Sequence, residues 1–241
     1  MIPSQDLFRL IKSLSKSEKR YFKLFYGSQA GKEGKNYKQL FYAIARQKEY
    51  DEPRLRQEIK EIKKFSITKH RLYHSLLRCL RLYHSRSSAS SRLYEMLHNI
   101  EILFDKGLLP ECARMVKQAQ RVASLYDKDL ILLELLEWEA RLARESEYKK
   151  ITKQKLNKIA QQEISLLEKH KSISEYRNIY DQYARLYLQY VHARTSRVKE
   201  EFHSVMNPSL PSKKKLPQAA TIYLHEAYAV YFRTIGDLNK T

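Results

Sequence analysis

The chain has 241 residues, a formal net charge of +19 and a hydrophobic fraction of 43%. That hydrophobic fraction argues against an intrinsically disordered chain, and the length allows one or two domains with a sizeable core. Only 5 glycines and 6 prolines interrupt a sequence rich in Leu, Lys, Glu, Gln and Arg, which all favour helices. We therefore predict an all-α protein.

The positive charge is concentrated at the N-terminal end. Residues 1–92 contain 22 Lys and Arg against 8 Asp and Glu, a net +14, whereas residues 93–241 carry only +5. This asymmetry indicates an acidic partner for the N-terminal part, such as nucleic acid, an anionic membrane surface or an acidic protein. Basic side chains that only solvate exposed helix faces would explain the charge equally well.

The first 88 residues are predicted to form a basic helical domain. Ser4 and a capping box at Ser15 and Glu18 are expected to begin the first two helices, and Asp51 with Pro53 the fourth. A loop that holds three of the glycines is expected at residues 27–34. The predicted helices cover residues 5–14, 16–25, 36–47, 52–64 and 66–85.

Basic residues near the end of this domain form a candidate basic patch. Between Arg71 and Arg81, basic side chains recur every three or four residues, which places them along one edge of a helix. No recognisable RNA- or DNA-binding module accompanies them, so the patch predicts only salt-sensitive contact with a nucleic-acid backbone. The predicted patch consists of Lys60, Lys63, Lys64, Lys69, Arg71, Arg78 and Arg81.

The serine-rich stretch at residues 85–91 marks the clearest change in composition. We place a domain boundary there, between the domain at residues 1–88 and a helical-repeat region at residues 89–241. Serines that cap the helices on either side would explain the stretch as well as a flexible linker does.

A helix hairpin at residues 97–123 organises the region that follows. Small residues recur on its second helix, and Gly107 in the turn is suited to ending the first. Gly107, Cys112 and Ala119 stand at the turn glycine and the small second-helix positions of a tetratricopeptide repeat, so the hairpin resembles that family. Ile100 departs from the small residue usual in the first helix, and the family's first aromatic and closing proline are missing.

The resemblance implies pairs of antiparallel helices that stack into a right-handed array with a concave partner-binding groove. Residues 129–167 are predicted to form a second pair, and a capping box at Ser172 and Glu175 is expected to open a third. The second helix of this third pair is expected at residues 198–207, and a fourth pair is expected to begin at residue 218.

The spacing of these pairs makes the region tetratricopeptide-like rather than a regular array. Ala140, Ala184 and Ala229 can be set at equivalent small positions, but their separations of 44 and 45 residues exceed the family's period of about 34. The turn expected at residues 235–238 is followed by no second helix, although a repeat array normally ends in a capping helix. Either the natural chain continues beyond Thr241, which we favour, or the last helix is itself the cap.

Five tyrosines form the most specific candidate site. They recur at intervals of four, three, four and three residues, which aligns them on one stripe of a helix. A dry core favours Phe or Leu over a hydroxyl group that needs a partner, so the stripe suits a half-wet groove that binds a peptide. A seam between two helices, with the hydroxyl groups at its rim, is the more common use of such a stripe. The candidate groove residues are Tyr176, Tyr180, Tyr183, Tyr187 and Tyr190.

No motif in the chain indicates catalysis. Glycine-rich phosphate-binding and nucleophile motifs are absent from the sequence, and His70 and His74 lack a third ligand at metal-binding spacing. We therefore expect no catalytic residue, no metal and no cofactor. Cys79 and Cys112 lie in apolar helical patterns and are expected to be buried thiols. Since no segment approaches the ~20 apolar residues of a membrane span and no signal peptide is recognised, a cytoplasmic location is expected.

These features predict a non-enzymatic interaction or scaffold module that binds a segment of a protein or peptide partner in a helical-repeat groove. The alternative is a nucleic-acid-binding regulatory protein that uses the basic helices of residues 1–88, with the array sensing or oligomerising. The two hypotheses place the site in different parts of the chain.

Overall fold

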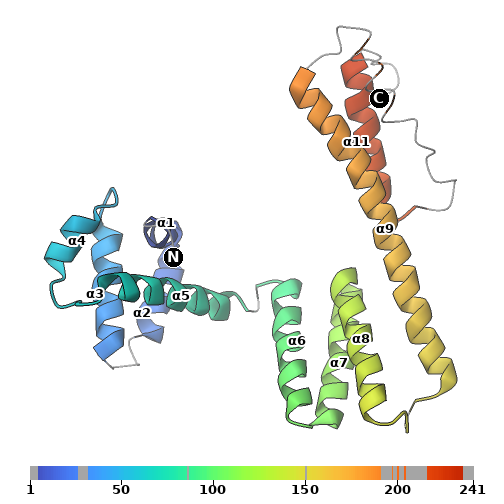
Figure 1. Ribbon diagram of the computed structural model, residues 1–241, viewed down its shortest axis with the longest axis horizontal. Coiled ribbons are helices and arrows are strands. Elements are labelled where there is room, and N and C mark those ends of the chain that lie inside the picture. The colour runs from blue at the N-terminus through green and yellow to red at the C-terminus, as the bar shows by residue number, and fades with distance from the viewer. Residues whose placement is uncertain are drawn as a thin grey trace. The chain divides into compact units, whose positions relative to one another are not determined.

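The computed structural model describes residues 5–26, 32–85, 87–149, 151–190 and 216–235, with isolated helical positions at 197, 200 and 204 (Figure 1). Of residues 32, 33, 190 and 235 only the backbone is described. Every regular element within these ranges is a helix, which confirms the predicted all-α class. The chain divides into two compact units, Met1–Leu108 (unit 1) and Leu109–Thr241 (unit 2).

Unit 1 is built around its fifth helix. The unit holds α1 (Asp6–Ser13), α2 (Lys16–Phe25), α3 (Lys32–Arg46), α4 (Glu52–Glu58), α5 (Phe65–His84) and α6 (Ala89–Asp105). Helix α5 packs against α1, α2 and α3, and its buried residues Leu72, Leu76 and Cys79 belong to one core with Phe22 and Phe41. The opposite face of α5 therefore lies outside this core.

Two helix starts in unit 1 follow the predicted capping signals. Ser15 and Glu18 form a complete capping box, because the Glu18 N–H donates to Ser15 Oγ and the Ser15 N–H donates to the Glu18 carboxylate. At the start of α4, the Arg54 N–H donates to Asp51 Oδ1 at 2.9 Å. Both signals act through backbone groups three residues away, which is why the local sequence suffices to place them.

The end of α4 differs from the prediction. This helix ends at Glu58 rather than near residue 64, and residues 59–64 form turns. Ile59 leaves the helical region of φ and ψ, and both Ile59 and Ile62 are buried. Residues three apart also share one face of a helix, so the burial of both side chains does not by itself account for this early end.

The serine-rich stretch contains a helix cap. The Ser91 N–H donates to Ser88 Oγ at 3.0 Å, so Ser88 is the N-cap residue of α6. Of the two explanations for the serine-rich stretch, a helix cap and a flexible linker, the helix cap therefore applies at Ser88. The domain boundary expected near residue 88 stays a prediction, and the compact units separate at Leu108.

Within the described residues of unit 2, four helices pack in chain order. They are α7 (Leu109–Leu125), α8 (Asp129–Glu145), α9 (Lys153–Tyr190) and α11 (Gln218–Ile235). Helix α7 packs on α8, α8 packs on the first part of α9, and α11 packs on the second part of α9 (Figure 1). One long helix therefore serves two separate packing interfaces.

Helices α6, α7 and α8 share one length and one way of ending. Each has 17 residues, and they begin at residues 89, 109 and 129. The residues that follow them, Gly107, Asp127 and Glu147, have positive φ values of 71°, 50° and 51°. After each, the next N–H donates to a carbonyl in the last helical turn, the Schellman arrangement. Gly107 therefore ends α6 as predicted. The turns at Asp127 and Glu147 contain no glycine, so the sequence does not show that they repeat the turn at Gly107.

The predicted break between the second and third helix pairs is wrong. Helix α9 is continuous over 38 residues, so Ser172 and Glu175 lie inside it and begin no new helix. No glycine or proline interrupts this segment. Its buried face changes instead: at 100° per residue, Tyr183 in the α11 interface lies roughly two thirds of a turn from Ile159, which is buried beside α8.

Two expectations fall on parts of the chain that are not described. The helix expected at residues 198–207 and the turn expected at residues 235–238 lie outside the described residues, apart from isolated backbone positions. Within the described ranges, no helix combines the length and the apolar character that crossing a bilayer requires.

Candidate functional site

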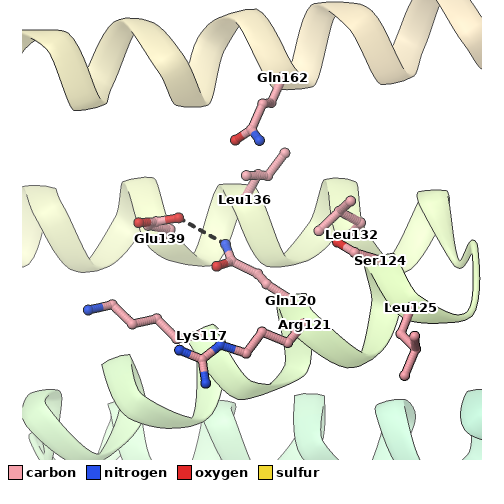
Figure 2. A pocket seen from close by; sticks show the side chains of 9 residues that line it. All are labelled: Lys117, Gln120, Arg121, Ser124, Leu125, Leu132, Leu136, Glu139 and Gln162. Atoms are coloured by element: carbon pink, nitrogen blue, oxygen red, sulfur yellow. Dashed lines mark hydrogen bonds between the residues drawn. The ribbon is translucent and has the colours of Figure 1, made fainter.

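Three consecutive helices of unit 2 enclose a groove, which we call the α7–α9 groove. It has a volume of about 620 Å³ and is open to solvent (Figure 2). Helix α7 contributes most of its lining. The lining residues are Lys117, Gln120, Arg121, Ser124 and Leu125 from α7, Leu132, Leu136 and Glu139 from α8, and Gln162 from α9.

The basic side of the groove follows from the packing of α7. The buried face of this helix carries Val116, Ala119 and Ala123, each at most 1% exposed. Since each residue advances by about 100° around the helix, Lys117 and Arg121 share the neighbouring face. Figure 2 shows both side chains extending from α7 on the same side of the groove. Both are exposed, and neither forms an ion pair within the described part of the chain.

Glu139 is the one acidic side chain among the lining residues, and it is already paired. Its carboxylate accepts a hydrogen bond from Gln120 Nε2 at 2.9 Å and forms an ion pair with Lys155. Burial alone would raise the pKa of this carboxyl group, but the bonds from Lys155 and Gln120 and the nearby charge of Lys117 lower it overall. Lys117 and Arg121 therefore leave the groove with surplus positive charge.

Apolar side chains lie toward the other end of the groove. Leu136 is 3% exposed and belongs to the packing between helices, whereas Leu125 is 75% exposed. Figure 2 shows Leu125 and Leu132 at the end away from Lys117. This arrangement can hold a chain segment that offers carboxylates to the basic side and an apolar side chain to Leu125 and Leu132.

The tyrosine stripe lies in the seam between α9 and α11. Tyr183 is fully buried and Tyr176 is 2% exposed. The ring centroid of Tyr183 lies 5.8 Å from that of Tyr231 on α11, and the ring centroid of Tyr180 lies 6.0 Å from that of Tyr223. These distances are typical of packed aromatic pairs, so the stripe contributes to the α9–α11 interface.

The remaining two tyrosines are Tyr187 and Tyr190. Tyr187 is half-buried, and the side chain of Tyr190 is outside the described residues. A partner cannot reach Tyr176 and Tyr183 while α11 is seated on α9. A peptide groove at the five tyrosines therefore stays a prediction that requires α11 to move.

One member of the predicted basic patch is part of an internal network. The Lys69 amino group lies 2.8 Å from Glu52 Oε2 and 3.3 Å from the Tyr50 hydroxyl oxygen. Burial alone would lower the pKa of Lys69, but these hydrogen bonds raise it overall. Hydrogen bonds from Lys69, Tyr50 and Arg56 lower the pKa of Glu52 to about 2, against the opposing effect of burial. Lys69 therefore joins α5 to α4 instead of meeting solvent.

The other six members of the predicted patch are exposed. Three lie on α5 and three lie in the turns between α4 and α5. They are Lys60, Lys63, Lys64, Arg71, Arg78 and Arg81. The patch is thus divided between solvent-facing side chains and the one lysine that the fold uses internally.

The two cysteines are buried, as predicted. Burial raises the pKa of the Cys79 thiol to about 11 and raises that of Cys112 as well, so neither is a reactive thiolate. Nε2 of His70 and Nε2 of His74 lie 3.3 Å apart. Among the described residues, no group of three or more His, Cys, Asp or Glu is placed to hold a metal ion.

No family model, curated protein or solved structure matches this chain. The groove is therefore argued from its own geometry. Its basic residues were not predicted from the sequence, although Lys117 and Arg121 stand four residues apart beside the small-residue face of α7. Glu139 carries no such signal, because only the folded chain brings Gln120 and Lys155 to it.

Proposed function

We propose that this chain is a non-enzymatic protein-interaction module whose α7–α9 groove binds an extended segment of a partner protein. The observation that carries the proposal is the surplus positive charge in an open groove whose own carboxylate, Glu139, is already paired. Grooves between repeated helices hold partner segments through a few anchoring side chains, and no chemical step is needed.

The segment that fits best is acidic, with an apolar residue nearby. Lys117 and Arg121 are separated by about 6 Å along the helix axis, close to the spacing of about 7 Å between alternate residues of an extended chain. Two carboxylates of one segment can therefore meet both cations, and the Arg121 guanidinium can bind its carboxylate in bidentate fashion. Leu125, largely exposed in the free chain, would take the apolar side chain.

We also propose that unit 2 is a tetratricopeptide-like array. The sequential packing of α7, α8 and α9 and the small residues Cys112 and Ala119 in the core support this. The continuous α9 and its second interface with α11 depart from the family's regular pairs. The proposal is therefore limited to the part of unit 2 that forms the groove.

Selection of peptides from a random displayed library against the full chain tests the binding function. Enriched peptides would be titrated against the natural chain, the variant Lys117→Glu/Arg121→Glu, and the control Lys153→Glu/Lys171→Glu. The control makes the same charge change at exposed positions of α9 outside the groove lining.

We expect the enriched peptides to be acidic and to contain an apolar residue. The groove variant should bind them at least about tenfold more weakly than the natural chain, and the control should bind them with unchanged affinity. Failure to enrich any sequence would contradict the proposal. So would enriched peptides that bind both variants equally well, because the groove would then not be their site.

A further inference from the structure

We propose that the exposed face of α5 in unit 1 is a second interaction surface, which binds the sugar–phosphate backbone of a nucleic acid. This surface lies in a different unit from the α7–α9 groove, so the two proposals stand or fall separately. The starting observation is that α5 has 20 residues and contains no Asp or Glu. A solvated helix face normally carries both signs of charge, so a helix of this length without an acid is unusual.

The basic residues of α5 form one line along its exposed side, which we call the α5 stripe. Leu72, Leu76 and Cys79 hold the opposite side in the core of unit 1. The stripe extends over about 15 Å of helix axis, with a basic or histidine side chain at each turn. Its members, all exposed, are Arg71, His74, Arg78 and Arg81.

Several acids of unit 1 are held by side chains outside this stripe. Arg78 and Arg81 form no ion pair with any described residue, whereas three glutamates of unit 1 are each held by other side chains. The pairs are Glu18 with His84, Glu52 with Lys69 and Arg56, and Glu58 with Arg46. Arg78 and Arg81 therefore keep their charge for an external anion.

A nucleic-acid backbone matches this geometry. Duplex DNA carries one negative charge per about 1.7 Å, so side chains spaced by one helical turn find phosphates whatever the register. Guanidinium groups bind phosphate oxygens in bidentate fashion, which suits the arginines of the stripe. An α-helix also fits the major groove of duplex DNA, and the exposed side of α5 is long enough to enter it.

A membrane surface fits less well. Helices that bind in the bilayer interface insert a continuous apolar face, and the apolar face of α5 is buried in the core. Its exposed large hydrophobic residues are Ile67, Leu77, Leu82 and Tyr83, which are 49%, 40%, 44% and 40% exposed. They are separated by ten, five and one positions and form no continuous insertion surface.

Fluorescence anisotropy with the full chain tests the proposal. Labelled duplex DNA and duplex RNA of mixed sequence would be titrated between about 50 and 200 mM salt, the range over which backbone binding weakens steeply. The variant Arg78→Glu/Arg81→Glu reverses two charges of the stripe, and Lys153→Glu/Lys171→Glu makes the same change on exposed positions of α9. A third variant, Arg78→Lys/Arg81→Lys, keeps the charge.

We expect the natural chain to bind duplexes at low salt and the stripe variant to bind at least about tenfold more weakly. The slope of log affinity against log salt should fall by about two units, one for each lost phosphate contact. The α9 control should change affinity less than about twofold, and the lysine variant should keep most of the binding. Circular dichroism checks that the variants remain folded. If the stripe variant does not fold, Arg78→Gln/Arg81→Gln takes its place.

Absence of binding at low salt overturns the proposal, and so do equal losses in the stripe and α9 variants. Vesicles containing phosphatidylserine and a polyglutamate chain serve as competing anions. If either one, but neither duplex, bound the natural chain and lost binding in the stripe variant, the stripe would be a membrane or acidic-protein surface instead.

Discussion

Nε2 of His84 lies 2.7 Å from Oε1 of Glu18, so the end of α5 is joined to the capping box that begins α2. The same carboxylate accepts the Ser15 N–H. These bonds, with the one to His84 the largest, lower the pKa of Glu18 to about 2. One side chain therefore begins a helix and also holds together two helices that lie far apart in the sequence.

Replacement of Glu18 by Gln should lower stability at neutral pH and reduce the chain's sensitivity to acid. The pKa of Glu18 is lower in the folded chain than its ordinary value of 4.5, so its contribution is present above pH 4.5 and is lost as the pH falls toward 2. We expect a loss of about 1–2 kcal/mol at pH 7 and a much smaller one at pH 3. Urea unfolding at both pH values measures the difference.

The exposed Glu168 on α9 provides the control for this measurement, since it forms no ion pair within the described residues. Glu168→Gln should change the free energy of unfolding by less than about 0.5 kcal/mol at either pH. If Glu18→Gln lost as much stability between pH 7 and pH 3 as the natural chain does, the bond to His84 would not contribute.

Replacement of Gly107 by Ala should destabilise the end of α6. The φ of this residue is 71°, and an added Cβ would meet no atom within 4 Å, so the cost is backbone strain alone. We expect a loss of about 1 kcal/mol in the free energy of unfolding, measured in urea. Lys106→Ala, at an exposed neighbour with a φ of −84°, should have little effect; equal effects of the two changes would refute the strain argument.

Replacement of Glu147 by Gly should have the opposite sign and stabilise the chain. Glu147 ends α8 with a φ of 51°, which glycine adopts without strain. Its ion pair with Lys149 joins side chains that are 75% and 72% exposed, so losing it costs little. We expect a gain of about 0.5–1 kcal/mol in the free energy of unfolding, measured in urea. Glu145→Gly, inside the helix, should destabilise instead; a loss in both variants would show that the turn is not strained.

Replacement of Tyr183 by Ala should release α11 from α9. Tyr183 is fully buried against Tyr231, so truncation leaves a cavity and should cost about 3–5 kcal/mol. Tyr187→Ala, one turn later at a half-buried position, should cost much less. Hydrogen exchange of the α11 amides distinguishes the two: we expect faster exchange only in the Tyr183 variant. Similar exchange in both would mean that the stripe does not hold the seam.

The local features that could be predicted from the sequence are those whose partners lie within a few residues. The capping box at Ser15 and Glu18, the cap at Asp51 and the turn at Gly107 all depend on nearby backbone groups. The same kind of signal failed at Ser172 and Glu175. There the helix continues through the motif, because side chains before and after it are packed by α8 and α11 and nothing breaks the backbone.

The candidate sites show the same division between local pattern and distant contact. The spacing of the tyrosines shows that they share a face, but α11, which begins at Gln218, decides that this face is a seam. Likewise, the sequence predicts that Lys69 is a surface cation, whereas in the folded chain it contacts Tyr50 and Glu52. No pattern near Lys117 and Arg121 shows that their neighbour Glu139 is already neutralised by Lys155.

The sequence by itself determined the helical class, the capped starts of α2 and α4, the burial of both cysteines and the line of basic residues on α5. These follow from propensity, apolar period and short-range hydrogen bonds, which act over one or two helical turns. Only the tertiary structure decided which helix face is covered by another helix, which charged side chains form ion pairs and where the α7–α9 groove lies. Those properties depend on side chains that are distant in the chain and meet only when their helices pack.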